Sequence, residues 1–182
     1  MSSKKPSMRK SKDLNLKVAL AQIKTQPGQL EQNKNKIIAT IKAARDAGAQ
    51  LVVFPELALC GYGSLDLFLN QAYLEQSRKF LEEIKAQTAG ITAVIGFADY
   101  NSDQRRSGQR LEVFNSAAVL SDCQLQLIQN KILLPTFQFF RKSVILCQQL
   151  RRNFLRSLEL KLAWKSAKTY GVKDILKIQP RS

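Results

Sequence analysis

The 182-residue sequence contains no histidine, and its three cysteines (Cys60, Cys123 and Cys147) are unevenly spaced. The lack of histidine excludes histidine-based catalytic triads and histidine metal sites, and an odd, uneven set of cysteines does not fit a disulfide framework or a metal cluster. No apolar run approaches the ~20 residues of a membrane span, and the N-terminus lacks the apolar block of a signal peptide. We therefore expect no metal, no cofactor and no membrane, and a reducing, cytoplasmic setting.

Acidic residues are scarce at the two ends of the chain. The net charge of +15 divides into +5 for residues 1–12, +9 for residues 141–182 and only +1 for the 128 residues between them. A basic arm can bind phosphate, and Trp164 and Tyr170 could stack on bases, so a nucleic-acid-binding protein is one interpretation. A solvated tail is the commoner cause of such a charge run, and we prefer it.

Apolar residues recur with strand and helix periods in turn between residues 14 and 134. The first helical pattern places Ile37, Ile41 and Ala44 on one stripe, with Ile38 beside it, and Gly48 follows its last periodic residue. Glycine is the usual residue just beyond a helix C-terminus. The pattern predicts strands at 14–23, 50–54, 91–100, 111–120 and 123–134, with a turn around 121–122, and helices at 30–48 and 71–90.

The second helical pattern carries Leu74, Leu81 and Ile84 inward and ends at Gly90. Strands that alternate with helices of this length predict an α/β domain, in which helices cover a sheet.

Several motifs resemble the nitrilase, or carbon–nitrogen hydrolase, superfamily in order and spacing. They are "VALAQI", "GAQLVVFPELALCGY", "FNSAAVL" and "NKILLPTFQFF". Within that superfamily, "ELALCGYGSLDLF" most resembles the glutamine-hydrolysing amidase domain of NAD synthetases. The resemblance implies a layered α-β-β-α sandwich with only its N-terminal part present in residues 14–140. It also implies glutamine or another small amide as substrate, and it leaves a homo-oligomer open.

Two residues in these motifs match catalytic positions of the family. Attack on an unactivated amide needs a thiolate, a base for its proton and a fixed positive charge facing the developing oxyanion. The resemblance assigns the base to Glu56 in "FPEL" and the positive charge to Lys131 in "NKILLP". Taken singly, Glu56 could be a loop carboxylate in a helix cap or salt bridge, and Lys131 a solvated lysine at a strand end. Together with the flanking motifs, the catalytic roles are favoured.

Two further polar residues in the motifs have less specific interpretations. Tyr62 in "CGYG" could line the substrate pocket or pack beneath the loop, and the sequence does not separate the two. We expect Asn115 in "FNSAAVL" to be structural, bonded to backbone in the sheet.

The family's nucleophilic cysteine has no counterpart in the sequence. In the family it follows the lysine in a pattern like "G-V-x-I-G-x-x-I-C-E-D-x-W". Cys60 precedes Lys131, Cys123 lies in a predicted turn, and Cys147 has none of the expected neighbours. We interpret all three as packed or incidental thiols.

A reading-frame displacement would explain where the resemblance stops. Codons built from the third base of each codon and the first two of the next can spell Lys-Arg-Tyr-Phe-Val-Pro-Ala over residues 142–149. Over residues 158–172 they can spell Gly-Val-Lys-Ile-Gly-Leu-Glu-Ile-Cys-Glu-Asp-Leu-Trp-Gly. We hypothesise that the chain from about Arg141 is an out-of-frame translation of an amidase gene. The alternative is a divergent C-terminal helix, which the spacing of Leu150, Phe154 and Leu158 would fit.

These observations predict three parts: a disordered basic tail over residues 1–13, a partial amidase domain over 14–140, and a basic tail over 141–182 that is not native to the fold. The favoured function is that of a glutamine amidase fragment that lacks its thiol and is inactive. Another small-amide hydrolase that uses one of the existing cysteines comes second, and the nucleic-acid-binding protein third.

Overall fold

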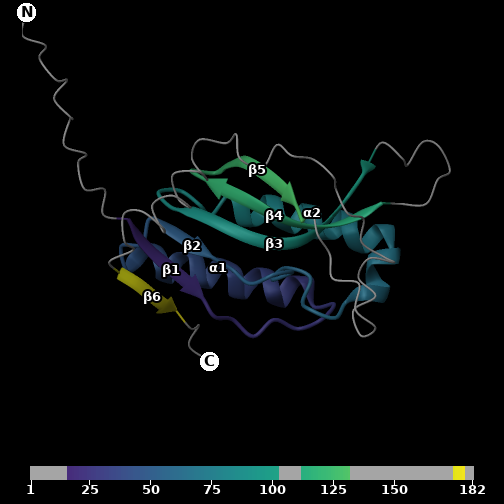
Figure 1. Cartoon of the computed structure of the whole chain (residues 1–182), viewed down its shortest axis with the longest axis horizontal. Coiled ribbons are helices and arrows are strands. Elements are labelled where there is room, and N and C mark those ends of the chain that lie inside the picture. Colours follow the sequence, from purple (N-terminus) through teal and green to yellow (C-terminus); the bar gives the residue numbers. More distant parts are fainter. Residues whose placement is uncertain (1–15, 103–111, 132–173, 179–182) are drawn as a thin grey trace, which may run out of the picture.

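The computed structural model describes residues 16–102, 112–131 and 174–178, which form one α/β unit (Figure 1). Strands and helices alternate over the first hundred residues, as the periodicity predicts. In chain order the elements are β1 (Lys17–Ala21), α1 (Leu30–Asp46), β2 (Leu51–Val53), the 3-10 helix η1 (Leu65–Leu69), α2 (Gln71–Lys85), β3 (Thr92–Tyr100), β4 (Val113–Ser121), β5 (Gln124–Asn130) and β6 (Asp174–Ile178).

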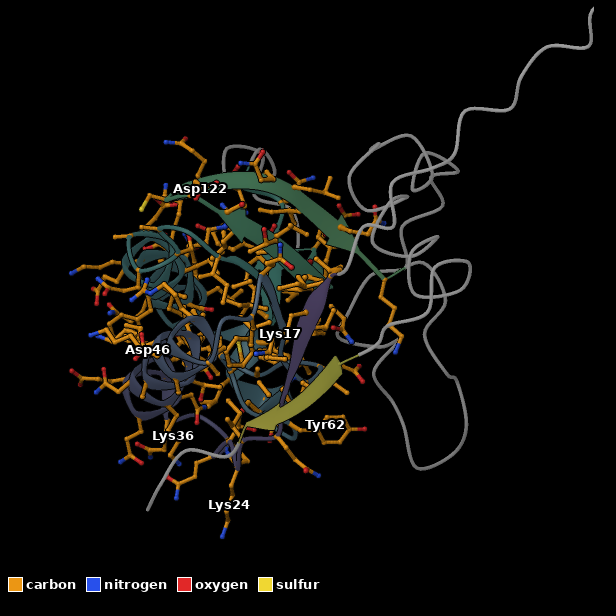
Figure 2. The ribbon with its side chains drawn as sticks, turned by 90° about the vertical axis from the view of Figure 1, so that its left-hand side faces the viewer. Lys17, Lys24, Lys36, Asp46, Tyr62 and Asp122 are labelled. Atoms are coloured by element: carbon orange, nitrogen blue, oxygen red, sulfur yellow. The ribbon has the colours of Figure 1, made fainter. Side chains whose placement is uncertain are left out.

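The strands form a single mixed sheet with the order β5-β4-β3-β2-β1-β6. Strands β6, β1, β2 and β3 are parallel, whereas β4 and β5 are added antiparallel to β3. The chain steps from β1 to β2 to β3 in one direction across the sheet. Because such crossovers are almost always right-handed, α1 and α2 belong on the same face, and they lie together on one side of the sheet (Figure 2).

One face of the sheet is more deeply buried than the other. Ala19, Val52 and Ala93 are in register on three adjacent strands, and none has exposed surface. Leu20, whose side chain points to the opposite face, is 41% exposed. The described residues thus supply one helical layer and one sheet of the expected sandwich, with the core between them.

Both helices bury the stripes that the sequence predicts. The members of these stripes are buried to within a few per cent: Ile37, Ile41 and Ala44 on α1, and Leu74, Leu81 and Ile84 on α2. Ile38 is partly buried against the same core. Each buried Ile or Leu side chain in these stripes stabilises the fold by roughly 1.5–3 kcal/mol.

The second helix ends five residues earlier than predicted. It stops at Lys85 rather than at Gly90 because Thr88 caps the last turn, its hydroxyl donating to the Lys85 carbonyl at 2.8 Å. The following turn also holds the tip of the β4–β5 hairpin. The Thr88 carbonyl accepts from the backbone N–H of Asp122, and the Thr88 hydroxyl accepts from the backbone N–H of Cys123.

The β4–β5 hairpin has a two-residue turn and one irregular position. Asp122 and Cys123 both have positive φ, 49° and 60°, as expected of the primed turns that suit the twist of a hairpin. Gln126 has no partner in the register, since Leu120 pairs with Leu125 and Val119 pairs with Leu127. The strand therefore contains a β-bulge at Gln126.

The loop after β2 crosses the middle of β3 at Gly96. A Cβ atom on Gly96 would lie 2.5 Å from the Pro55 carbonyl oxygen and 2.6 Å from the Leu57 nitrogen. Only glycine therefore allows the backbone that carries Glu56 to lie against the sheet.

The two predicted tails fall almost entirely outside the described residues. The segment 1–13 is not described, and of 141–182 only β6 is, which pairs in parallel with β1. The origin of that segment stays a prediction. Among the helices that the structure describes, none is long and apolar enough to cross a membrane.

We predict that Gly96→Ala destabilises the fold by about 1–3 kcal/mol, because the new methyl group overlaps main-chain atoms that cannot rotate away. Gly90→Ala is the matched control: nothing lies within 4 Å of its Cβ, and only its positive φ of 72° costs energy. Urea denaturation measures both. A Gly96→Ala protein as stable as the parent chain would show that the loop does not lie against the sheet.

Candidate active site

Glu56 lies just beyond the carboxyl end of β2. The Phe54 N–H extends the ladder by donating to the Val94 carbonyl at 2.9 Å, and the chain then turns across Gly96. The carboxylate Oε1 of Glu56 accepts a hydrogen bond from the side-chain amide of Asn115 and lies 3.4 Å from the Lys131 ammonium. The structure thus brings together the two residues that the sequence predicts to be catalytic, although they are 75 positions apart.

This pair is half-exposed rather than buried. The side chains of Lys131 and Glu56 retain 40% and 37% of their surface. An exposed ion pair at this distance contributes at most about 1 kcal/mol to stability. The pair is therefore accessible to a small molecule from solvent, and its loss would cost the fold little.

Asn115 is the functional candidate that the sequence interpretation missed. It is 4% exposed near the start of β4, opposite Ala98, and its side chain donates to Glu56 rather than to sheet backbone as expected. Its backbone carbonyl accepts from the Lys131 N–H at 2.7 Å. One signal was available, because alternation along β4 places Asn115 on the face that Glu56 crosses.

The loop that carries Glu56 is held from below by the carbonyl of Cys60. This single oxygen accepts from Ser64 Oγ at 2.7 Å, from the Gly28 N–H at 3.1 Å and from the Tyr73 hydroxyl at 3.1 Å. Burial raises the pKa of the Tyr73 phenol, so that its hydroxyl keeps the proton that it donates.

Asn33 ties the same loop to α1. Its side chain has no exposed surface; it accepts from the Gln26 N–H at 2.9 Å and donates to the carbonyls of Gln26 and Leu59. A buried amide satisfied in this way specifies one geometry, because each lost partner would leave a polar group without water. Neither Asn33 nor Ser64 could be assigned this role from local sequence.

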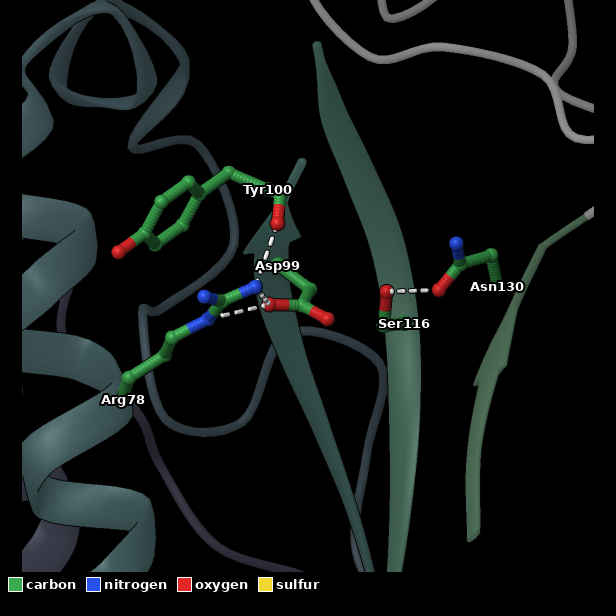
Figure 3. A network of polar contacts seen from close by, with 5 residues as sticks. All are labelled: Arg78, Asp99, Tyr100, Ser116 and Asn130. Atoms are coloured by element: carbon green, nitrogen blue, oxygen red, sulfur yellow. Dashed lines mark hydrogen bonds and ion pairs between the residues drawn. The ribbon is translucent and has the colours of Figure 1, made fainter. Parts of the chain in front are cut away.

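A second polar network fixes the strands that carry the site (Figure 3). On α2, Arg78 donates to the buried carboxylate of Asp99 at 2.8 Å and to the Tyr100 carbonyl, and its guanidinium lies 3.8 Å from the Tyr100 ring centroid. Ser116 Oγ donates to Asn130 Oδ1 at 2.7 Å, joining β4 to β5 one residue before Lys131.

Tyr62 is not packed beneath the loop. The residue is 48% exposed and lies at the border of the described body (Figure 2). The packing interpretation is therefore wrong, and its assignment to a substrate pocket stays a prediction.

An apolar hollow of about 280 Å³ lies beside the loop. It is lined by residues 20–23 at the end of β1 and by Pro55, the residue before Glu56. A hollow with this lining suits the aliphatic part of a small molecule better than a charged group.

Neither described cysteine is placed as a nucleophile. Cys60 has no exposed surface, and its Sγ accepts from the Ala98 N–H at 3.4 Å. Burial raises the pKa of its thiol more than the hydrogen bonds of the thiol lower it. Cys123 lies in the hairpin turn, and the seven residues of β4 from Asn115 to Ser121 separate it from the site by roughly 20 Å. Cys147 lies outside the described residues.

In the described part of the chain, no three Cys, Asp or Glu side chains gather as a metal site would require.

A carboxylate and an ammonium held side by side at the ends of sheet strands are of the class of groups that transfer protons and stabilise developing negative charge. The particular family follows from sequence comparison: the chain belongs to the carbon–nitrogen hydrolase family, whose pattern matches residues 17–146.

Similar curated proteins are glutamine-dependent NAD(+) synthetases. The one from Thermotoga maritima is 36% identical over 127 residues, which are 69% of this chain and 20% of the relative. The one from Xylella fastidiosa (strain Temecula1) is 39% identical over 126 residues, or 69% of this chain and 22% of the relative. The chain thus spans about a fifth of the length of these relatives.

Solved structures with the same fold include two glutamine-dependent NAD(+) synthetases. That from Cytophaga hutchinsonii superposes with a TM-score of 0.69 at 21% identity, over 77% of this chain and 23% of the other. That from Acinetobacter baumannii gives 0.67 at 29% identity, over 75% and 24%. An amidase from Nesterenkonia sp. gives 0.59 at 16% identity, over 78% and 51%. These matches agree with the layered nitrilase-like fold predicted from the sequence.

We predict that iodoacetamide at pH 8 alkylates Cys60 at least about tenfold more slowly than Cys123 in the folded chain. The reactive form is the thiolate, and a raised pKa together with complete burial keeps Cys60 protonated and out of reach. Peptide mass spectrometry over a time course measures both rates. In urea the two rates should converge, and rapid labelling of Cys60 before unfolding would contradict its position.

Proposed function

We propose that this chain carries part of a glutamine amidase site, with Glu56 as the general base and Lys131 as the group that stabilises the oxyanion, and that it does not hydrolyse glutamine. The observation that supports the proposal is the Glu56 carboxylate, which lies between the Lys131 ammonium and the Asn115 amide where parallel strands end. In open α/β sheets this edge is where ligands bind.

The chemistry gives each group a distinct task. In an amidase of this family, a thiol would pass its proton to Glu56 as its sulfur attacks the amide carbon. The developing negative oxygen would then be stabilised by the ammonium of Lys131. The exposed surface of both side chains leaves room for a small amide to approach.

The proposed lack of activity rests on the thiols. Covalent acyl transfer has no first step without a nucleophile, whatever the remaining electrostatics provide. Cys60 is sealed in the core and Cys123 lies at the far end of the sheet, so neither can reach an amide held beside Glu56.

The out-of-frame origin of the C-terminal segment explains the missing thiol. The displaced spelling recovers a cysteine within "Gly-Leu-Glu-Ile-Cys-Glu-Asp", at Ser166 and Ala167 of the present sequence. The role in NAD synthesis suggested by the relatives would be to supply ammonia. The 182 residues contain no glycine-rich phosphate loop of the kind that nucleotide-binding synthetase domains carry.

DNA sequencing of codons 136–175 tests this origin. We expect codon choices throughout 142–149 and 158–172 that permit the displaced spelling, including a serine codon that ends in T at Ser166. A single incompatible codon inside either motif would remove the displacement and favour a divergent C-terminal helix.

An ammonia-release assay with glutamine tests the function. We predict that the 182-residue chain releases no more ammonia than its Glu56→Gln variant. Insertion of one base at codon 141 restores the displaced frame, and the product of that gene should hydrolyse glutamine unless Glu56→Gln or Lys131→Gln is added. Hydrolysis by the original chain, or none by the restored gene product, would contradict the proposal.

An electrophilic glutamine analogue separates this proposal from a small-amide hydrolase that uses another sulfur. We expect no cysteine of the chain to be labelled faster than free cysteine is. Selective, glutamine-protected labelling of Cys60, Cys123 or Cys147 would identify a working nucleophile.

A further inference from the structure

Asn115 contacts both members of the Glu56–Lys131 pair through different groups. Its side-chain amide donates to Glu56 Oε1, and its main-chain carbonyl accepts from the Lys131 N–H at 2.7 Å. The ammonium of Lys131 lies 3.4 Å from the same oxygen, Glu56 Oε1. Two groups, the Asn115 amide and the Lys131 ammonium, therefore converge on one carboxylate oxygen, and the main chains of their two strands are bonded to each other.

We propose that Asn115 is the positioning residue that sets the geometry of this pair. Its amide holds the Glu56 carboxylate toward Lys131, and its carbonyl fixes the point at which the Lys131 side chain leaves the sheet. The inference rests on the proposed function for its meaning, because a base and an oxyanion-stabilising cation must be held in register with each other.

The residue type fits this task. An asparagine amide donates at every pH and brings no charge, so it can orient a carboxylate without competing for a proton. A serine would be shorter, and an aspartate would repel Glu56. The donor itself is immobile, since Asn115 is 4% exposed within β4 and is paired with Ala98 of β3.

The half-exposed carboxylate of Glu56 is the group that depends most on the hydrogen bond from Asn115. A glutamate side chain that keeps 37% of its surface has more rotamers open to it than a buried one, and each contact that it makes narrows this choice. Its backbone is already fixed, because the loop lies against Gly96 and cannot move closer to the sheet. The remaining freedom is in the side chain, and the Asn115 amide acts on it.

The amine reactivity of Lys131 in the existing chain provides the test. Trace acetylation with acetic anhydride, followed by peptide mass spectrometry, gives the rate at Lys131 relative to the exposed Lys24. We expect Asn115→Leu and Asn115→Ala each to raise this relative rate about two- to fivefold. The Lys131 amine is then no longer held against the Glu56 carboxylate, and the loss of an exposed ion pair worth at most about 1 kcal/mol corresponds to a factor of at most about five.

A double-mutant cycle shows whether Asn115 acts through Glu56. Glu56→Gln should raise the Lys131 rate to a similar extent, and Asn115→Leu should add nothing in that background. Ser121→Ala is the matched control. It lies on the same face of the same strand and loses a hydrogen bond to Thr92, but it is far from Lys131 and should leave the rate unchanged.

The outcomes are distinct. Unchanged Lys131 reactivity in both Asn115 variants, or an equal effect with and without Glu56, would overturn the positioning role. A purely structural role would lower the urea midpoint and raise the rates at all lysines together. Failure of the restored gene product to hydrolyse glutamine would overturn the proposed function while leaving a positive coupling result intact.

Discussion

The close approach of the loop after β2 to Gly96 is the constraint on which the site depends. With no side chain at that position, the Pro55–Leu57 backbone lies against β3, within 2.6 Å of where a Cβ would stand. Because of this contact, the chain beyond the end of β2 continues beside β3 instead of leaving the sheet. The Leu59 N–H then donates to the Gly96 carbonyl at 3.1 Å, two residues along β3 from the Val94 carbonyl that the Phe54 N–H uses. Glu56 is thereby presented from a rigid support, although it belongs to a loop.

The loop after β2 is held by neutral hydrogen bonds in the core, whereas the Glu56–Lys131 pair that it presents is charged and accessible to solvent. Asn33, Ser64 and Tyr73 hold the loop through buried groups that water does not weaken. The ion pair on top is half in water, where its own contribution to stability is small. This division lets the loop keep its shape while the charged groups remain accessible to solvent. It also implies that the scaffold would persist if either charged side chain were replaced.

Local sequence predicted those features that local physics decides. The stripes at Ile37, Ile41 and Ala44 follow from the helical period, and the family motifs identified Glu56 and Lys131, which the structure places in contact. The early end of α2 could not be predicted, because it depends on a hairpin that binds Thr88 from 34 positions further along the chain. The contact between Asn115 and Glu56 joins residues 59 positions apart across a loop of unusual backbone geometry. Alternation along β4 is compatible with the face that Asn115 occupies, but it does not identify Glu56 as the partner.

The irregularity at Gln126 decides on which side of the sheet the ammonium emerges. Side chains alternate along a strand, and one unpaired residue inverts the parity of all those that follow. Asn130 accordingly meets Ser116 on one surface, and the next residue, Lys131, emerges with Asn115 on the other. In an uninterrupted strand the same lysine would point to the opposite surface, away from Glu56. The one extra residue, Gln126, thus reverses the side-chain alternation of β5, so that Lys131 and Glu56 from distant segments of the chain lie on the same face of the sheet.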